Sequence, residues 1–464
     1  MESRYLEIMM PDFSEVLGKI PDWKDYFTVD ELHERSADIV NEYPNKIELI
    51  ELGNSRGGEV IECLKIGEGR HNGLIYGFPN PEEPFGGNLL DYLSWSLAED
   101  DKLRRELDYT WYLIKCIDPD GGRLNEGFHK GPFTPLNFTL NYYRTPNHLT
   151  GESCFPFRFG PLDLNDPVPE TSVLMRLMDR IPFDFISSLH MMKWGGITFE
   201  VPEPCPELYA PFLQLTRDFR VFPRKRLGTT IAPGVQLAAY LTPARGYIKE
   251  WARGNTSVEP IRGCYAYEYG LVLNPRLFMM IPECCIWHDE RMWNDSLSES
   301  TVGDLVRYED ERENEVNTFM VNVWRETEPH LIDGSPFKVM MDEWMEPIVK
   351  RFTNVTNPPF KFDENVHARR ATVAEKIGME GHADLYRMFY LGGMIRAFKH
   401  LLDIKGNSTI ENAKDEVMTK IKEYDDFMNR NYDVKAHPIR NLVGVSLGSI
   451  LHSAMYAVRR KSCY

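Results

Sequence analysis

From Ile47 onward the chain contains short apolar runs of the length and pattern typical of β-strands. "KIELIELG" and "EVIECLKIG" are two such runs, and the "NSRGG" between them predicts a hairpin connection. "NGLIYGF" and "TWYLIKC" are almost wholly apolar, which is typical of central strands covered on both faces. "FDFISSLHMM" and "GITFEV" are predicted to be further strands.

Segments with helical periodicity lie between these strands. "GGNLLDYLSWSLAEDDKLRREL" predicts one amphipathic helix, and "PETSVLMRLMDRIP" predicts another that opens at Pro169. Strands and helices alternate to about residue 300. This alternation predicts an α/β fold built on a mixed, mostly parallel twisted sheet with helices on both faces.

Three regions are expected along the chain. Residues 1–40 are predicted to be an N-terminal helical segment, residues 41–304 an α/β domain, and residues 305–464 a helical C-terminal region. A polar, charged stretch, "SLSESTVGDLVRYEDERENE", lies near the second boundary. The helical prediction after it rests on four periodic segments: "KVMMDEWMEPIVKRF", "ADLYRMFYLGGMIRAFKHLLDI", "TIENAKDEVMTKIKEYDDFMNRNY" and "RNLVGVSLGSILHSAMYAVRRK".

Composition narrows the class of protein. The 464 residues are 42% hydrophobic and 27% charged, with a net charge of −17, which argues against a nucleic-acid partner. The acidic N-terminus does not resemble a secretory signal, and no segment resembles the roughly 20 apolar residues of a membrane span. Eight cysteines without a C-x-x-C pair indicate reduced thiols. A cytoplasmic protein without a membrane partner is expected.

Polar side chains follow four of the apolar runs. Ligand sites in open α/β sheets lie outside the carboxyl ends of the strands, so these positions are the candidates for chemistry. They are Asn80 and Glu83 after "GLIYGF", Asp118, Asp120, Arg123 and Asn125 after "TWYLIKC", His190 after "FDFISSL", and Glu268 in "CYAYEYG".

The order of these pieces resembles the zinc metallocarboxypeptidases related to carboxypeptidase A. In that family H-x-x-E follows a strand, N-P-D-G follows the next core strand, substrate-binding Asn and Arg come next, then a lone His ends a strand and a Glu lies on a late strand. This chain has "NPEE", "DPDGGRLNEG", "NFTLNYYR", "SSLH" and "CYAYEYG" in that order. It is most similar to a bacterial-type branch with H-P-x-E-P before D-P-D-G-x-R-L-N-E-G. The resemblance covers about Tyr43 to Met280.

The resemblance implies a metal-dependent hydrolase. Zinc held by two His and one Glu would activate a water, a Glu would act as general base, and arginines would hold the oxyanion and the substrate carboxylate. By position, the implied roles are Asn80, Glu83 and His190 as metal ligands, Glu268 and Arg123 as catalytic residues, and Asn125, Asn141, Tyr142 and Arg144 as substrate-binding residues.

Two positions depart from the family pattern. Asn80 stands where the first metal ligand should be His, and Tyr142 stands where an Arg should follow Asn141, with Arg144 two residues further on. An amide oxygen is a weak zinc ligand. The metal site is therefore expected to hold zinc weakly, to hold another divalent metal, or to hold none. Nothing in the sequence places His129 at the metal.

Each candidate also has an ordinary structural interpretation. Asn80 with Pro81 and Glu83 is a good helix N-cap with a capping box, "DPDGG" is a common turn, and His190 is an ordinary core histidine. Three functions therefore remain open. The first is a carboxypeptidase-like hydrolase with an altered metal site, acting on a peptide or amide bond near a free carboxylate. The second is a catalytically inactive protein that binds peptides, and the third is a repurposed enzyme that modifies a peptide or amino-acid amide in a biosynthetic pathway.

Overall fold

The computed structural model describes residues 11–224, 230–238, 242–255, 262–353 and 367–460. Two nearly continuous stretches of strand form the centre of its twisted sheet. One stretch consists of β7 (Phe185–Ser188) and β8 (His190–Trp194), and the other consists of β12 (Phe278–Met279) and β13 (Ile281–His288). Phe278 lies opposite Phe185 and Glu283 lies opposite His190 in the same parallel register. The two six-stranded sheets that contain these segments therefore run into each other.

The first half of the sheet confirms the predicted strands. It contains β1 (Ile47–Asn54), β2 (Val60–Ile66), β3 (His71–Tyr76) and β4 (Tyr109–Ile114) in the order β1-β2-β4-β3-β7. β1 and β2 form the predicted antiparallel hairpin, and β4, β3 and β7 are parallel. The parallel strands end together, which places the turns after β3, β4 and β7 at one edge.

The second half of the sheet is mixed. β13 pairs antiparallel with β9 (Thr198–Val201), which pairs parallel with β11 (Val235–Leu237). β10 (Thr230–Ala232) and β16 (Lys435–Ala436) complete this half of the sheet. Short strand pairs outside the sheet are β5 (Phe157–Phe159) with β6 (Leu162–Leu164), and β14 (Leu297–Thr301) with β15 (Arg370–Thr372).

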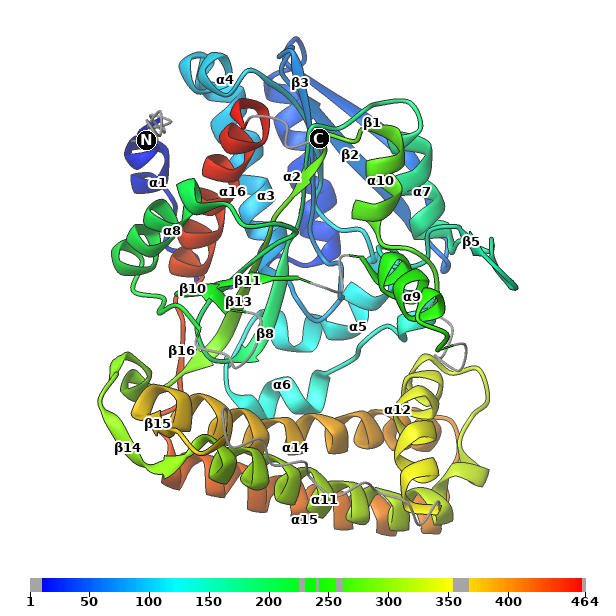
Figure 1. The fold of residues 1–464 in the computed structure, drawn as a ribbon. Coiled ribbons are helices and arrows are strands. Elements are labelled where there is room, and N and C mark those ends of the chain that lie inside the picture. Colours follow the sequence, from blue (N-terminus) through cyan, green and yellow to red (C-terminus); the bar gives the residue numbers. More distant parts are fainter. Residues whose placement is uncertain (1–10, 225–229, 239–241, 256–261, 354–366, 461–464) are drawn as a thin grey trace.

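Helices cover both faces of the sheet (Figure 1). One core contains Ile75 and Leu113, and the other contains their strand neighbours Leu74 and Ile114, as expected when successive side chains point to opposite faces. The helices of this part are α1 (Ser14–Gly18), α2 (Val29–Glu42), α3 (Phe85–Glu99), α4 (Asp101–Leu107), α5 (Pro119–His129), α6 (Pro135–Asn141), α7 (Pro169–Met178), α8 (Pro206–Asp218), α9 (Pro243–Ala252) and α10 (Ala266–Leu273). The α/β fold class is confirmed.

One predicted helix is divided in two. The segment from Gly86 to Leu107 forms α3 and then α4 rather than a single helix. The division occurs at Asp100, whose side chain accepts hydrogen bonds from the backbone N–H of Lys102 and Leu103 and so begins a new helix.

The C-terminal region is helical, as predicted, and all of its helices except the last lie at the end of the sheet (Figure 1). Its helices are α11 (Val302–Thr327), α12 (Pro336–Thr353), α14 (Val373–Leu402), α15 (Ser408–Asn431) and α16 (Ile439–Arg459). Within the described residues, α16 alone is long and apolar enough to cross a membrane by composition, but 83% of its apolar window is buried. It packs against α3 and α8 and serves as a core helix of the α/β part.

Buried histidines predict that the fold loses stability in mild acid. Burial lowers the pKa of His129 to about 4, of His452 to about 4 and of His437 to about 3. The unfolded chain binds protons at these positions below about pH 6.5 while the folded chain does not, so stability falls as pH falls. Between pH 7 and pH 5 each of these histidines should lower the free energy of unfolding by about 2 kcal/mol.

This loss can be measured as the free energy of unfolding in denaturant at each pH. The His452→Leu variant should lose about 2 kcal/mol of the pH dependence, since one buried histidine has been removed. If the free energy of unfolding depended on pH in that variant as steeply as in the wild type, the fold would not keep His452 neutral.

Candidate ligand-binding site

The turn after β3 places Asn80 and Glu83 at the edge of the sheet. Phe78 has φ of 56°, an uncommon conformation for a bulky residue, and so turns the chain sharply after the strand. α3 begins only after Pro84, which makes no side-chain cap. The Asn80 amide instead lies 3.0 Å from Glu83 Oε1 and 3.1 Å from His190 Nδ1. The capping-box interpretation of this turn is therefore wrong.

His190 links two buried carboxylates. Its Nδ1 lies 3.0 Å from Glu83 Oε2, and its Nε2 lies 2.9 Å from Glu152 Oε1. Burial alone would lower the pKa of His190, but the Glu152 and Glu83 charges outweigh it and hold that pKa well above its ordinary value. Burial raises and His190 lowers the pKa of Glu152, and the lowering is larger. His190 is thus an imidazolium held between two carboxylates.

Two further cations lie on the other side of the same turn. Arg144 lies 2.7 Å from Glu82 Oε1, and Lys193 Nζ lies 3.3 Å from the same oxygen. Both also approach Glu83, at 4.0 and 3.8 Å. Burial raises the pKa of Glu82, but Lys193 and Arg144 lower it more, so this carboxyl is ionised. The side chains of Glu82 and Lys193 are 0% and 4% exposed, so the pair is screened from water.

A cavity of about 680 Å³ opens beside these groups. The α/β part contributes Asn80, Glu83, Arg144, His190 and Glu283 to its lining. The helical region contributes an aromatic wall, which consists of Trp344 from α12 and Tyr386, Phe389 and Tyr390 from α14. The cavity therefore depends on both parts of the chain.

The structure brings together five of the residues predicted from the sequence. Asn80, Glu83, Tyr142, Arg144 and His190 all line this cavity. Asn80, Glu83 and His190 come from two strand ends, as the carboxyl-end rule predicts.

The remaining predicted residues lie elsewhere, and Glu268 needs the largest correction. It is on helix α10 rather than on a late strand, and it does not line the cavity. Its carboxylate accepts hydrogen bonds from the backbone N–H groups of Ala244 and Arg245 at 3.1 and 2.8 Å. Those bonds hold the starts of two helices in place, which is a structural role.

Arg123 is also outside the cavity. It projects from α5 to Asp30 at 2.7 Å and Glu59 at 3.0 Å, in a partly exposed ion-pair group. Asn125 is buried and bonds to the backbone of Gly121 and Tyr143. Asn141 bonds back to Asn137 within α6. These three side chains stabilise the local structure and do not line the cavity.

Four charged residues at the cavity were missed by the sequence prediction: Glu152, Lys193, Arg262 and Glu283. Glu283 stands alone in the apolar run "LFMMIPECCIW", and Lys193 stands alone in "HMMKW". A charge inside an apolar strand is costly unless it has a partner or a function, and that signal could have identified both residues. Glu152 lies in an irregular turn with no comparable signal.

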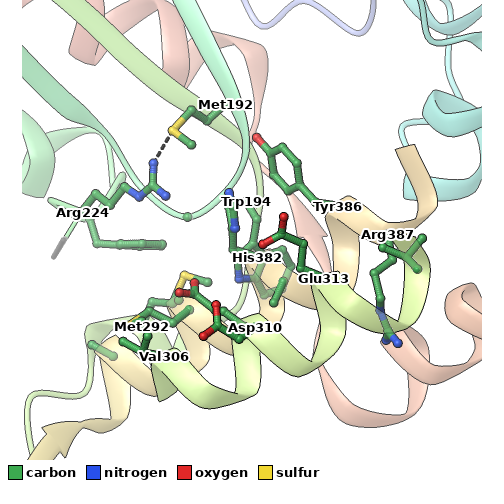
Figure 2. Close-up of a pocket in the computed structure, with 18 of the residues that line it drawn as sticks. Met192, Trp194, Arg224, Met292, Val306, Asp310, Glu313, His382, Tyr386 and Arg387 are labelled. Atoms are coloured by element: carbon green, nitrogen blue, oxygen red, sulfur yellow. Dashed lines mark hydrogen bonds between the residues drawn. The ribbon is translucent and has the colours of Figure 1, made fainter. Parts of the chain in front are cut away.

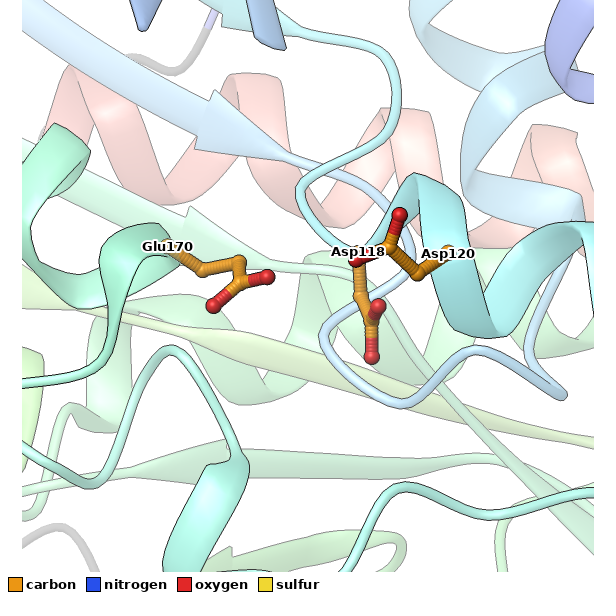
Figure 3. Close-up of side chains that lie close together, drawn as sticks. All are labelled: Asp118, Asp120 and Glu170. Atoms are coloured by element: carbon orange, nitrogen blue, oxygen red, sulfur yellow. The ribbon is translucent and has the colours of Figure 1, made fainter. Parts of the chain in front are cut away.

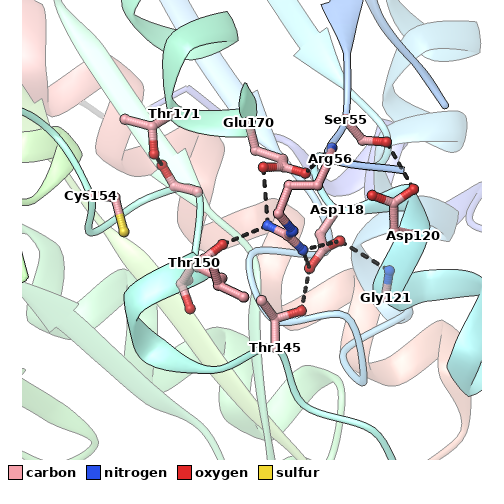
Figure 4. Close-up of polar contacts among 12 residues, drawn as sticks. Ser55, Arg56, Asp118, Asp120, Gly121, Thr145, Thr150, Cys154, Glu170 and Thr171 are labelled. Atoms are coloured by element: carbon pink, nitrogen blue, oxygen red, sulfur yellow. Dashed lines mark hydrogen bonds and ion pairs between the residues drawn. The ribbon is translucent and has the colours of Figure 1, made fainter. Parts of the chain in front are cut away.

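A second group of acids lies nearby. Ligand oxygens of Asp118, Asp120 and Glu170 lie within 4.8 Å of one another (Figure 3). Arg56 fills this group, with its guanidinium 3.0 Å from Glu170 and 3.4 Å from Asp118 (Figure 4). It also donates to the Leu149 carbonyl at 2.7 Å. Asp118 and Glu170 thus share a built-in arginine, while Asp120 accepts hydrogen bonds from Ser55 and Gly57.

A second cavity of about 430 Å³ adjoins the first one. Met192, Tyr386 and Tyr390 line both. Figure 2 shows Tyr386 and Arg224 directed toward Met192 at their common boundary, with Asp310 and Glu313 of α11 on the far side. The two cavities flank the same aromatic wall.

The residues present do not fit a catalytic zinc ion. The candidate donors are one imidazole, one carboxylate and one amide, whereas a catalytic zinc site needs three good protein ligands and an open position. His190 has a carboxylate close to each ring nitrogen, Glu83 at 3.0 Å and Glu152 at 2.9 Å. Lys193 lies 3.8 Å from the same Glu83.

Comparison with known proteins gives partial matches. No family model matches the chain. A curated protein named zinc carboxypeptidase A 1, from Anopheles gambiae, is 29% identical over 105 residues, which is 22% of this chain and 24% of that protein. The chain thus spans about a quarter of the length of this relative.

Solved structures with related names are also similar in part. Carboxypeptidase A from Helicoverpa armigera matches with a TM-score of 0.38 and 13% identity, over 56% of this chain and 64% of that one. A putative metallopeptidase from Shewanella denitrificans matches with a TM-score of 0.36 and 13% identity, over 55% and 81%. A metallo-carboxypeptidase from Burkholderia cenocepacia matches with a TM-score of 0.34 and 12% identity, over 56% and 60%. The sequence similarity to a carboxypeptidase is thus confined to one segment of 105 residues.

Proposed function

We propose that the protein is a carboxypeptidase-like binding protein for a short peptide or an amino-acid amide, and that the cavity of about 680 Å³ is its ligand site. The proposal rests on one observation about charge. Within the described parts of the chain, Arg262 and Glu283 line the cavity but make no side-chain hydrogen bond or ion pair. Arg144, Lys193, His190, Glu83 and Glu152 are all paired.

These two unpaired groups suit the two polar ends of a peptide. A guanidinium binds a carboxylate through two parallel N–H donors, and a carboxylate accepts from an amine or amide N–H. The aromatic wall, including Trp344 and Phe389, offers apolar surface for the side chains between them. A ligand with a free carboxylate and a nearby N–H group meets all three conditions.

Binding without hydrolysis is favoured over cleavage by the misfit of the metal site. Hydrolysis by a metallocarboxypeptidase needs a polarised water, and the groups around His190 are arranged to neutralise one another instead. Because the aligned relative is covered over only 24% of its length, its activity is not carried over to this chain.

The proposal can be tested by calorimetric titration with short peptides. A free C-terminal carboxylate should bind, and the C-terminally amidated peptide should bind on the order of 10-fold more weakly or worse, since a charge-assisted hydrogen bond is lost. The Arg262→Ala and Glu283→Gln variants should each lose affinity to a similar extent. The Arg123→Leu and Glu268→Gln variants are matched controls and should bind as the wild type does, since neither residue lines the cavity.

Three outcomes would contradict this function. Equal affinity for the free and amidated peptides would remove the carboxylate contact. An unchanged affinity in the Arg262→Ala variant would move the ligand elsewhere. Release of a free amino acid from the same peptides, measured by mass spectrometry, would make the protein a hydrolase.

A further inference from the structure

The charges around Glu83 are balanced by the chain itself. Glu82 and Glu83 supply two negative charges, and Arg144 and Lys193 supply two positive charges within 4.0 Å of them. In a metal-dependent site a dication would be the largest local charge and would neutralise its carboxylate ligands. In this chain the cationic side chains already supply the positive charge that a metal ion would bring.

Lys193 is the least expected member of this group. It is on β8, three residues after His190, and its neighbours Met191, Met192 and Trp194 are apolar. Its Nζ donates to Glu82 at 3.3 Å and to the Met191 carbonyl at 3.0 Å. A buried ammonium is costly without partners, and these contacts fix it beside the carboxylates.

The same turn carries a second change of charge. Glu82 is fully buried and adds a negative charge beside Glu83, and its partners are Arg144 and Lys193. Its other oxygen, Oε2, has no hydrogen-bond partner among the described residues. Glu82 therefore holds two cations next to Glu83.

We propose that Lys193, supported by Arg144, takes the electrostatic place of the catalytic metal ion, so that this carboxypeptidase-like site works without a bound metal. The ammonium group is a fixed cation 3.8 Å from Glu83, and the Asn80 amide contacts both Glu83 and His190 where a further imidazole ligand would otherwise stand. A zinc ion held by Glu83 would meet the like charge of Lys193. This inference does not depend on the proposed ligand, because it concerns metal binding alone.

The test measures zinc binding in the full chain, by calorimetric titration with zinc and by metal analysis after dialysis. The wild type should contain no stoichiometric zinc and should bind it no more tightly than the His190→Ala variant does. In the Asn80→His/Lys193→Met variant, a ligand is added and a like charge is removed. Removing the charge alone should raise zinc affinity about 10–100-fold, the range found for groups next to metal ligands, and the added imidazole should raise it further.

A charge-matched variant guards against misfolding. In Asn80→His/Glu82→Gln/Lys193→Met, the buried acid and base are removed together, so the balance of charge is kept. Zinc should raise the melting temperature of this variant and leave that of the wild type unchanged, since only a protein that binds the metal is stabilised by it.

Two results would overturn the inference. One is a wild type that retains one zinc per chain which is lost in His190→Ala. The other is an equal, weak zinc affinity in the wild type and in both folded multiple variants, which would show that Lys193 and Asn80 do not govern metal binding.

Discussion

Replacing His190 by leucine is expected to lower the free energy of unfolding by about 3–5 kcal/mol, because it removes the cation from between two buried carboxylates. Glu152 loses its charged partner at 2.9 Å and Glu83 loses one at 3.0 Å. The pKa of His190 lies well above its ordinary value, so this contribution is fully present below the ordinary histidine pKa of about 6.5 and declines as pH rises from there to the raised pKa. Denaturant unfolding at about pH 6 therefore measures nearly all of it.

His148 provides a matched control for this experiment. Its Nδ1 lies 3.1 Å from Glu343, a distance similar to those at His190, but its side chain is 39% exposed. Exposed ion pairs contribute about 0–1 kcal/mol, so His148→Leu should change stability by no more than that. Similar losses in the two variants would mean that burial does not strengthen the His190 contacts.

The sequence located the ends of the parallel strands correctly, but it did not show all of the side-chain contacts made there. The turn after β3 and the end of β7 could be located because apolar runs stop there, and polar side chains at parallel strand ends meet at one edge. This reasoning brought Glu83 and His190 together correctly. It could not show that Glu152, from an irregular turn, contacts the second nitrogen of His190.

The error at Glu268 has a physical cause. "CYAYEYGLV" contains aromatic and β-branched residues that favour a strand, but in the fold it forms α10 with Glu268 in a capping box. Sequence order alone then assigned the late acid to Glu268. Glu283, on the true late strand β13, lies opposite His190 in the parallel register, a relation that only strand pairing reveals.

The helical region could be predicted as helical but not placed. The periodic pattern of α12 and α14 shows which faces are apolar, and it does not show which surface those faces cover. In the fold Trp344 and Tyr386 form a wall of the cavity at the end of the sheet. The candidate site is thus a product of two regions that are far apart in sequence.

Replacing Arg56 by leucine is expected to have the second large effect, also about 3–5 kcal/mol of stability, because Glu170 and Asp118 would remain buried without their cation. The side chain of Glu170 is 0% exposed and that of Arg56 is 22% exposed. Arg56 also bonds to the carbonyl of Leu149, three residues before Glu152, so its loss should loosen the segment that carries Glu152. Amide hydrogen exchange should therefore rise in residues 149–152 more than elsewhere on the sheet edge.

Arg123→Leu is the matched control, since it removes an arginine that also bridges two acids. Its partners Asp30 and Glu59 are 70% and 36% exposed, so water can replace the lost contacts. The loss of stability should stay within about 1 kcal/mol, with no change in amide hydrogen exchange at residues 149–152.

If Arg56→Leu behaved like this control, the acids around Arg56 would have to be neutralised by protonation rather than by the arginine. Burial does raise the pKa of Glu170, so that alternative predicts full stability of the variant at low pH and a loss as pH rises. Unfolding measured at pH 5 and pH 8 separates the two explanations, because an Arg56 ion pair makes the wild type more stable than the variant already at pH 5, whereas neutralisation by protonation leaves no difference at pH 5.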